Sequence, residues 1–252
     1  GAALILIQIS YPGLDDINLL FTGDYNNKNI FFDVPNLPDW VLNLPITVVQ
    51  ESTYGDMDST EIIENLEDNI LSCIRRRKTA VCLVFSLGRC QEVLYLLKKW
   101  QDRGDISKSI PIYLDGTLAI NYTQLYVNAN IGIKKEMHNF LPKNLTFVSK
   151  EMRPALLDSD NCKIILTTSG MGSYGPAQVY IPAYINREDC LLQFTGYTAE
   201  GTLGRKLKDA QKGDIVTING IVKQKLAEVE YTNELSAHAK ADELIDFLRN
   251  FN

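Results

Sequence analysis

Four loops of the sequence combine glycine with hydroxyl side chains directly after runs of apolar residues. They are Glu51-Ser52-Thr53-Tyr54-Gly55, Phe85-Ser86-Leu87-Gly88-Arg89, Thr168-Ser169-Gly170-Met171-Gly172 and Gly196-Tyr197-Thr198-Ala199-Glu200-Gly201-Thr202. Glycine lets backbone N–H groups approach an anion, hydroxyl groups add donors, and the positive end of a following helix favours negative charge. One such loop is more often a tight turn between a strand and a helix, but four of them favour a phosphate ligand.

The candidate contacts to phosphate or RNA come from the last three of these loops. They are Ser86, Gly88, Arg89, Ser169, Gly170, Gly196, Tyr197, Gly201 and Thr202. Arg89 is expected to open a helix, where the helix dipole disfavours a cation, so a role facing a phosphate is plausible there. The run Arg75-Arg76-Arg77-Lys78 is expected instead to end a helix, where cations are favoured, and is interpreted as a solvated cap.

The first elements of the chain predict a small β-rich part. Two apolar runs, residues 3–9 and 17–22, are separated by Tyr11-Pro12-Gly13, which is typical of a β-hairpin. Residues 35–45 then carry three prolines, which interrupt regular structure and indicate a boundary between two structural units. We therefore expect the β-rich part to cover residues 1–45.

From residue 46 the pattern alternates between apolar β-branched runs and amphipathic stretches of helical period. The expected strands are residues 46–50, 79–85, 110–114, 145–148, 163–167 and 190–194. A helix is expected over residues 58–77, with an apolar stripe of Ile62, Ile63, Leu66, Ile70, Leu71 and Ile74. This pattern predicts an α/β fold with a doubly wound, mostly parallel sheet over residues 46–212, whose ligands bind at the carboxyl ends of the strands.

After residue 213 the pattern changes again. Two extended runs, residues 214–219 and 221–231, precede a last helix over about residues 239–251. We expect the segment 213–252 to return to the β-rich part formed by residues 1–45.

Composition and charge exclude several classes of protein. Apolar residues make up 45% of the chain and charged residues 22%, as in globular proteins, and no run reaches the roughly 18 apolar residues of a membrane span. The net charge of -6 excludes a generally basic nucleic-acid-binding protein, so any site for a polyanion must be local. Five cysteines without C-x-x-C spacing favour a reducing, cytoplasmic location. Two histidines are too few for a histidine-rich zinc centre.

A set of motifs resembles the β-CASP branch of the metallo-β-lactamase superfamily, which includes RNase J and the endonuclease of the cleavage and polyadenylation specificity factor. The motifs are Thr22-Gly23-Asp24, Glu51-Ser52-Thr53-Tyr54-Gly55, Ser169-Gly170-Met171 with Gly175-Pro176-Ala177, Gly196-Tyr197 with Glu200-Gly201-Thr202-Leu203, and Ser236-Ala237-His238. They occur in the order of the family and span nearly the whole chain. The combination is specific, although no single motif is.

The resemblance implies a two-zinc phosphodiesterase that acts on RNA, expected here to be single-stranded. Asp24 would bridge the two metal ions, which activate a hydroxide and neutralise the attacked phosphate. Glu51 and His238 would protonate the leaving oxygen, because a carboxylate that holds an imidazole fixes its tautomer. Taken alone, Asp24 is typical of a turn, Glu51 of the first solvated residue after a strand, and His238 of a helix start.

The sequence also departs from the family. The His-x-His-x-Asp-His motif is absent, Asp24 is the one implied metal ligand that is present, and Lys240 stands where the family often has aspartate. The chain starts within an apolar run and without methionine, so we expect a piece of a longer protein: an α/β β-CASP domain with a remnant of its metallo-β-lactamase partner. Such a piece is expected to be inactive alone and without tightly bound zinc.

Two alternatives stay open at this stage. The chain could be a non-catalytic module that binds RNA or docks a partner, or an unrelated nucleotide-binding α/β domain with similar loops. A homodimer is possible, and no membrane association is expected.

Overall fold

The computed structural model describes residues 3–251 except for residues 27, 35, 59, 61, 63, 130 and 131. The chain divides into two compact units, the first formed by Gly1–Ile62 with Ser236–Asn252 and the second by Ile63–Leu235. Among the described residues, none of the helices has the length and apolarity that a membrane crossing demands.

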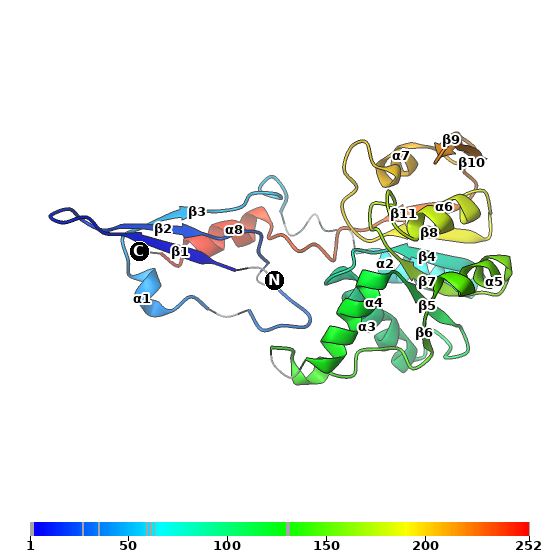
Figure 1. Cartoon of the computed structure of the whole chain (residues 1–252), viewed down its shortest axis with the longest axis horizontal. Helices are drawn as coiled ribbons and strands as arrows, with labels where there is room; N and C mark the ends of the chain where they lie inside the picture. The colour runs from blue at the N-terminus through cyan, green and yellow to red at the C-terminus, as the bar shows by residue number, and fades with distance from the viewer. Residues whose placement is uncertain are drawn as a thin grey trace. The chain divides into compact units, whose positions relative to one another are not determined.

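The first unit is built on a three-stranded sheet in the order β1-β2-β3. Strands β1 (Ile5–Ile9) and β2 (Ile17–Phe21) form the predicted antiparallel hairpin, with Ile5 opposite Phe21. The short helix α1 (Asp39–Leu42) follows the hairpin, and helix α8 (Ala241–Leu248) comes from the far end of the chain (Figure 1). Helix α8 is tied to the sheet because the Gln50 side chain donates a hydrogen bond of 3.0 Å to the carbonyl of Leu244.

Strand β3 (Ile46–Val49) differs from its expected place. The sequence pattern assigns it to the start of the α/β repeat, but in the structure it pairs in parallel with β2 and belongs to the first unit. Its residues alternate between half-buried and exposed, whereas a strand of the repeat is buried on both faces. A short apolar β-branched run has the same appearance in both settings, so its composition could not distinguish them.

The second unit is built on a six-stranded, entirely parallel sheet in the order β11-β8-β4-β7-β5-β6. Its strands are β4 (Thr79–Leu83), β5 (Ile112–Asp115), β6 (Leu145–Phe147), β7 (Ile164–Thr167), β8 (Cys190–Phe194) and β11 (Glu228–Tyr231). The three central strands β8, β4 and β7 are buried along their whole length. Continuous burial on both faces explains why these segments are apolar runs without alternation.

Helices cover both faces of this sheet, as a doubly wound α/β fold requires (Figure 1). Helices α5 (Arg153–Asp158), α6 (Ala177–Tyr184) and α7 (Leu203–Asp209) share one core with strands β4, β7 and β8. Helices α2 (Leu66–Arg75), α3 (Arg89–Arg103) and α4 (Thr117–Asn128) lie on the other side. Two 3-10 helices, η2 (Lys135–Met137) and η3 (Lys150–Met152), complete the connections. The predicted fold class is confirmed.

The helix expected over residues 58–77 is shorter in the structure. Helix α2 begins at Leu66 and buries Leu66, Ile70, Leu71 and Ile74 of the predicted stripe, together with Cys73. Of the remaining expected positions, Ile63 lies outside the described residues and Ile62 precedes the helix. The helical spacing of apolar residues in the sequence therefore extends upstream of the first residue of α2.

The two extended runs after residue 213 form three strands. Strands β9 (Ile215–Ile218) and β10 (Ile221–Gln224) pair as a hairpin whose turn is Asn219-Gly220, both with positive φ, as a two-residue turn between such strands favours. Strand β11 instead pairs in parallel with β8 at the edge of the large sheet. Residues 213–235 thus belong to the second unit, and only residues 236–252 return to the first.

Candidate functional site

Parallel pairing of β2 and β3 brings two carboxylates to one edge of the small sheet. Phe21 at the end of β2 lies opposite Val49 at the end of β3, and Asp24 and Glu51 follow these strand ends. Beyond the strands, the Thr22 N–H donates to the Val49 carbonyl over 3.0 Å. The Glu51 N–H donates to the Thr22 hydroxyl over 3.2 Å, which holds the two loops together.

The segment that carries His238 is bound to the same loops. The Asn26 side chain donates to the Ser236 carbonyl over 2.8 Å, and the Ala239 N–H donates to the Tyr25 carbonyl over 2.9 Å. The Ser236 hydroxyl accepts a hydrogen bond of 3.1 Å from the His238 N–H. Residues that are 187 positions apart in the sequence therefore meet at one edge of the first unit.

Glu51 and His238 form a direct hydrogen bond, with 2.7 Å between Oε2 and Nδ1. The second carboxylate oxygen of Glu51 accepts a 2.7 Å hydrogen bond from the Tyr25 N–H. Because an ionised carboxylate only accepts, Nδ1 of His238 carries the proton and Nε2 is the ring nitrogen that can exchange a proton with a ligand. The Glu51 side chain is 6% exposed and that of His238 27%, so the carboxylate is enclosed while the imidazole reaches solvent.

Asp24 completes a group of three possible metal ligands with Glu51 and His238, and one ligand atom from each lies within 4.8 Å of the others. Carboxylate oxygens and imidazole nitrogens are donors that zinc accepts. Both Glu51 oxygens accept hydrogen bonds inside the protein, whereas the Asp24 carboxylate is exposed. The arrangement fits Asp24 as a ligand and Glu51 as the residue that holds His238.

In the second unit, the strand-end loops gather at one edge of the sheet, as the parallel topology predicts. Strands β8, β4 and β7 are neighbours, and Gly196, Ser86 and Ser169 follow their carboxyl ends. The ring of Phe85 lies between two of these loops: a Cβ atom added to Gly170 would be 2.9 Å from it, and one added to Gly196 would be 3.0 Å away. Both glycines are thus explained by close packing on an aromatic ring.

Several predicted phosphate contacts make hydrogen bonds within the protein. Thr202 is the N-cap of α7: its hydroxyl accepts from the Arg205 N–H over 3.3 Å and donates to the Ala199 carbonyl over 2.6 Å. The Ser169 hydroxyl accepts from the Tyr174 N–H over 3.2 Å. These two hydroxyls shape their own loops. That they also contact phosphate stays a prediction.

Arg89 and the remaining loop residues divide between structural and exposed positions. The Arg89 side chain is 10% exposed, donates to the Thr195 carbonyl in the neighbouring loop, and lies 3.6 Å from the Glu92 carboxylate. Gly88 precedes α3 with a φ of +76°, which favours glycine. Gly201 is exposed, and Tyr197 is 58% exposed. Among the predicted contacts, Tyr197 and Gly201 are therefore the exposed ones.

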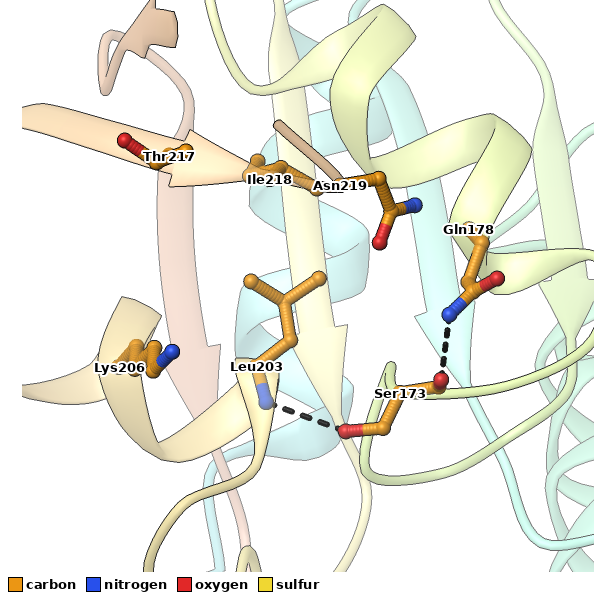
Figure 2. Close-up of a pocket in the computed structure, with 7 residues that line it drawn as sticks. All are labelled: Ser173, Gln178, Leu203, Lys206, Thr217, Ile218 and Asn219. Atoms are coloured by element: carbon orange, nitrogen blue, oxygen red, sulfur yellow. Dashed lines mark hydrogen bonds between the residues drawn. The ribbon is translucent and has the colours of Figure 1, made fainter. Parts of the chain in front are cut away.

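A small pocket of about 140 Å³ lies beside the loop that follows β7 (Figure 2). It is lined by Ser173, Gln178, Leu203, Lys206, Thr217, Ile218 and Asn219. The Ser173 hydroxyl accepts a hydrogen bond of 3.1 Å from the Leu203 N–H, and the Ser173 carbonyl accepts from the Gln178 side chain. The Gln178 N–H donates to the Gly175 carbonyl. The N–H groups of Gln178 at the start of α6 and of Leu203 at the start of α7 are thus already used inside the protein and are not available to an anion.

Sequence reasoning missed a buried polar cluster at the carboxyl end of β5. The Asp115 side chain, 1% exposed, accepts two hydrogen bonds from Arg153, over 2.7 and 2.9 Å, and one of 2.7 Å from the Tyr180 hydroxyl. Burial and the neighbouring Asp115 raise the pKa of Tyr180 far above its usual range. An acidic residue at the end of an apolar strand, directly before Gly116, was the available signal.

Comparison with known proteins agrees with the fold. Residues 90–207, which lie within the second unit, match the Beta-Casp domain. The transcription termination factor FttA of Methanosarcina mazei is 30% identical over 92% of this chain, and an RNase J-like protein of Methanocaldococcus jannaschii is 28% identical over 99%. The endoribonuclease ysh1 of Schizosaccharomyces pombe is 29% identical over 99%.

The chain spans only part of these relatives: 39% of the FttA protein, 58% of the RNase J-like protein and 32% of ysh1. The similarity nevertheless extends over nearly all of this chain and includes the segments that carry Asp24, Glu51 and His238 as well as the Beta-Casp match. The chain therefore belongs to the β-CASP branch of the metallo-β-lactamase superfamily.

Proposed function

We propose that this chain supplies the proton-transfer residues of a metal-dependent phosphodiesterase that cuts RNA. The observation that carries the proposal is the 2.7 Å hydrogen bond between Glu51 and His238, with Asp24 in the same group of three. Two of the similar proteins are named RNase J-like protein and endoribonuclease, which supports ribonuclease chemistry for the whole protein that contains this sequence.

His238 is the general acid in this proposal. Glu51 fixes the tautomer and the direction of the imidazole, so that Nε2 faces away from the carboxylate and can deliver a proton to the leaving oxygen of the phosphodiester. The enclosed carboxylate does not itself exchange protons with substrate, because both of its oxygens accept hydrogen bonds inside the protein. Glu51 is accordingly a positioning residue for His238.

Asp24 is the proposed metal ligand, and zinc is the proposed metal. Two zinc ions would supply an activated hydroxide and neutralise the attacked phosphate. Each ion needs several nitrogen and oxygen donors, and Asp24 is the one ligand that this proposal assigns among the described residues. We therefore expect the 252-residue chain on its own to lose zinc on dialysis and not to cut RNA. Metal analysis after dialysis checks the zinc content. Two tightly held zinc ions per chain would contradict this.

In this proposal the first unit is part of a metallo-β-lactamase domain and the second is the β-CASP domain that grips single-stranded RNA. Tyr197, 58% exposed at the carboxyl edge of the large sheet, is suited to stack on a base. Backbone donors of the loops at Ser86, Gly170, Gly196 and Gly201 would follow the phosphates. Such contacts are local, in keeping with the net charge of -6.

Substitution of His238 tests the proposal in the native protein that carries this sequence. We expect His238→Ala to lower turnover on end-labelled RNA by roughly 10²- to 10⁴-fold, the usual contribution of a positioned general acid, with zinc content and RNA affinity unchanged. Glu51→Gln should lower turnover too, and the double variant should lose little more, because the two residues act as a unit.

The second histidine of the chain provides a matched control. His138 is exposed, follows η2 in the other unit, and His138→Ala should cleave at the wild-type rate. If His238→Ala also cleaves at the wild-type rate, the assignment of the general acid is wrong. RNA binding without any chelator-sensitive cleavage by the native protein would favour a non-catalytic RNA-binding module instead.

A further inference from the structure

A buried lysine contacts an aromatic ring that also contacts the imidazole of the Glu51–His238 pair. Lys240 is 3% exposed, and its Nζ lies 3.7 Å from the centroid of the Tyr54 ring. The Tyr54 ring in turn contacts the His238 imidazole edge to face, with 5.8 Å between centroids and an angle of 85° between the planes. Lysine, tyrosine and histidine thus form a chain of contacts that ends at the proposed general acid.

The backbone fixes the same arrangement. Tyr54 and Lys240 form an isolated parallel β-bridge, and the Ala241 N–H donates to the Met57 carbonyl over 2.9 Å. The loop that carries Tyr54 is itself closed by a 3.0 Å hydrogen bond from the Gly55 N–H to the Ser52 carbonyl. The loop after β3 and the segment before α8 therefore hold Tyr54 and Lys240 in register with each other.

The energetics explain why the lysine and the ring occur together. An ammonium group removed from water loses hydration, and the negative face of a tyrosine ring offsets part of that loss. A cation seated on the ring restricts its tilt. A single hydrogen bond to Glu51 fixes Nδ1 of His238 but leaves the imidazole plane free to swing about that bond, so a second contact is needed to orient Nε2.

We infer that Tyr54, held in place by Lys240, is a positioning residue that sets the plane of the His238 imidazole. The inference rests on the proposed role of His238, because a fixed plane aims Nε2 at one point. It adds Tyr54 and Lys240, which take no part in proton transfer themselves. Tyr54 acts through its ring, so its hydroxyl group is dispensable.

The motion of the His238 ring tests this directly, because the chain has only two histidines. In the histidine-labelled 252-residue chain, NMR relaxation of the ring C–H groups should give His238 an order parameter that approaches the ~0.85 of rigid backbone, against less than about 0.6 for the exposed His138. Tyr54→Leu and Lys240→Met should lower the His238 value toward that of His138. Tyr54→Phe, which keeps the ring, should preserve the wild-type value.

Lys208→Met is the matched control. Lys208 is exposed and its Nζ lies 5.2 Å from the Tyr231 ring in the other unit, so this variant removes a lysine–tyrosine contact that is remote from His238. Its His238 ring should remain as ordered as in the wild type. Where Tyr54→Leu fails to fold, Lys240→Met decides, with amide spectra reporting the fold of each variant.

Turnover separates this inference from the proposed function. In the native protein, Tyr54→Leu should lower kcat by about 10- to 100-fold with KM unchanged, the cost of a misplaced catalytic group, while Tyr54→Phe stays near the wild type. A mobile His238 ring in the wild type, or an unchanged order parameter in Tyr54→Leu and Lys240→Met, overturns the inference. If ring order falls as expected but His238→Ala cleaves normally, the positioning holds and the proposed function fails.

Discussion

Both sheets of this protein end in polar loops, but the two sheets use those polar groups differently. At the edge of the three-stranded sheet, the exposed Asp24 carboxylate and Nε2 of His238 make no hydrogen bond among the residues that the structure describes. At the edge of the six-stranded sheet, Asp115 and Thr202 make hydrogen bonds inside their own unit. The first edge leaves these two polar groups open to a ligand, whereas the hydrogen-bonded groups of the second edge form a framework that holds its loops in shape.

Burial follows the same division. The strands β4, β7 and β8 are buried along their whole length, so the loops at the carboxyl edge of the large sheet follow directly from its core. In the hairpin of the small sheet, Ile5, Ile7, Ile17 and Phe21 remain exposed. A change at the large sheet should therefore register first as a loss of stability, and a change at the small-sheet site first as a loss of turnover.

Breaking the Asp115 cluster should give the largest loss of stability. Arg153→Leu leaves the Asp115 carboxylate buried with the Tyr180 hydroxyl as its main partner, and removing one member of a buried ion pair costs about 3 kcal/mol or more. Urea unfolding followed by tryptophan fluorescence measures this change, because Trp100 is buried in α3 of the same unit whereas Trp40, the second tryptophan, is 57% exposed.

An exposed arginine pair gives the control for that experiment. Arg205 and Asp209 are 2.9 Å apart, with side chains 37% and 58% exposed. Because solvent screens such a pair, Arg205→Leu should leave the free energy of unfolding close to that of the wild type. Equal losses in the two variants would mean that burial of Asp115 is not what stabilises this edge.

Thr202 tests whether the edge of the large sheet is framework alone. Thr202→Ala removes the N-cap of α7 and should destabilise the second unit by about 1 kcal/mol, whereas Thr202→Ser keeps the hydroxyl and should be nearly neutral. RNA affinity is expected to follow stability closely. A tenfold loss of RNA affinity in Thr202→Ala without loss of stability would instead assign Thr202 to phosphate contact and weaken the contrast between the sheets.

The architecture of the second unit was predictable because burial leaves a strong signal. Strands such as β4 and β8 are continuous apolar runs, and their alternation with amphipathic helices leaves few alternatives to a parallel sheet. The place of β3 was not predictable, because a four-residue β-branched run fits either sheet. The run 221–231 hid two strands for a similar reason: no composition change marks where β10 ends and β11 begins.

The candidate site was predictable only through the family resemblance. Nothing in composition or spacing indicates that residues 187 positions apart share a hydrogen bond. The resemblance of the Glu51 and His238 motifs to the family, in the family's order, does indicate that the two residues meet. Tyr54 belongs to one of the motifs, but its contact with Lys240 depends on a bridge between two loops and cannot be inferred from either segment alone. Thr202 and Gly170 were predicted to contact phosphate, but Thr202 caps a helix and Gly170 packs against an aromatic ring. Caps and close packing favour the same residue types as phosphate-binding loops.

The smallest expected effect concerns an exposed ion pair at the edge of the framework sheet. Glu228 in β11 accepts hydrogen bonds of 2.6 Å from both terminal nitrogens of Arg76 and one of 2.8 Å from Lys78. These partners, Arg76 above all, lower the pKa of Glu228 from its ordinary 4.5 to about 2.

Because the folded-state pKa is the lower one, the stabilisation is complete above about pH 4.5 and disappears as the pH falls toward 2. The Glu228 side chain is 33% exposed, so solvent screening keeps its contribution below about 1 kcal/mol. Glu228→Gln should therefore unfold slightly more easily than the wild type at neutral pH, and the difference should vanish near pH 2 and shrink in high salt. Urea unfolding of both proteins across this range measures it. A difference in the free energy of unfolding that persists at low pH would mean that Glu228 stabilises β11 by packing rather than by charge. A difference as large as that of Arg153→Leu would mean that the framework is stabilised at its surface as much as by its buried polar cluster.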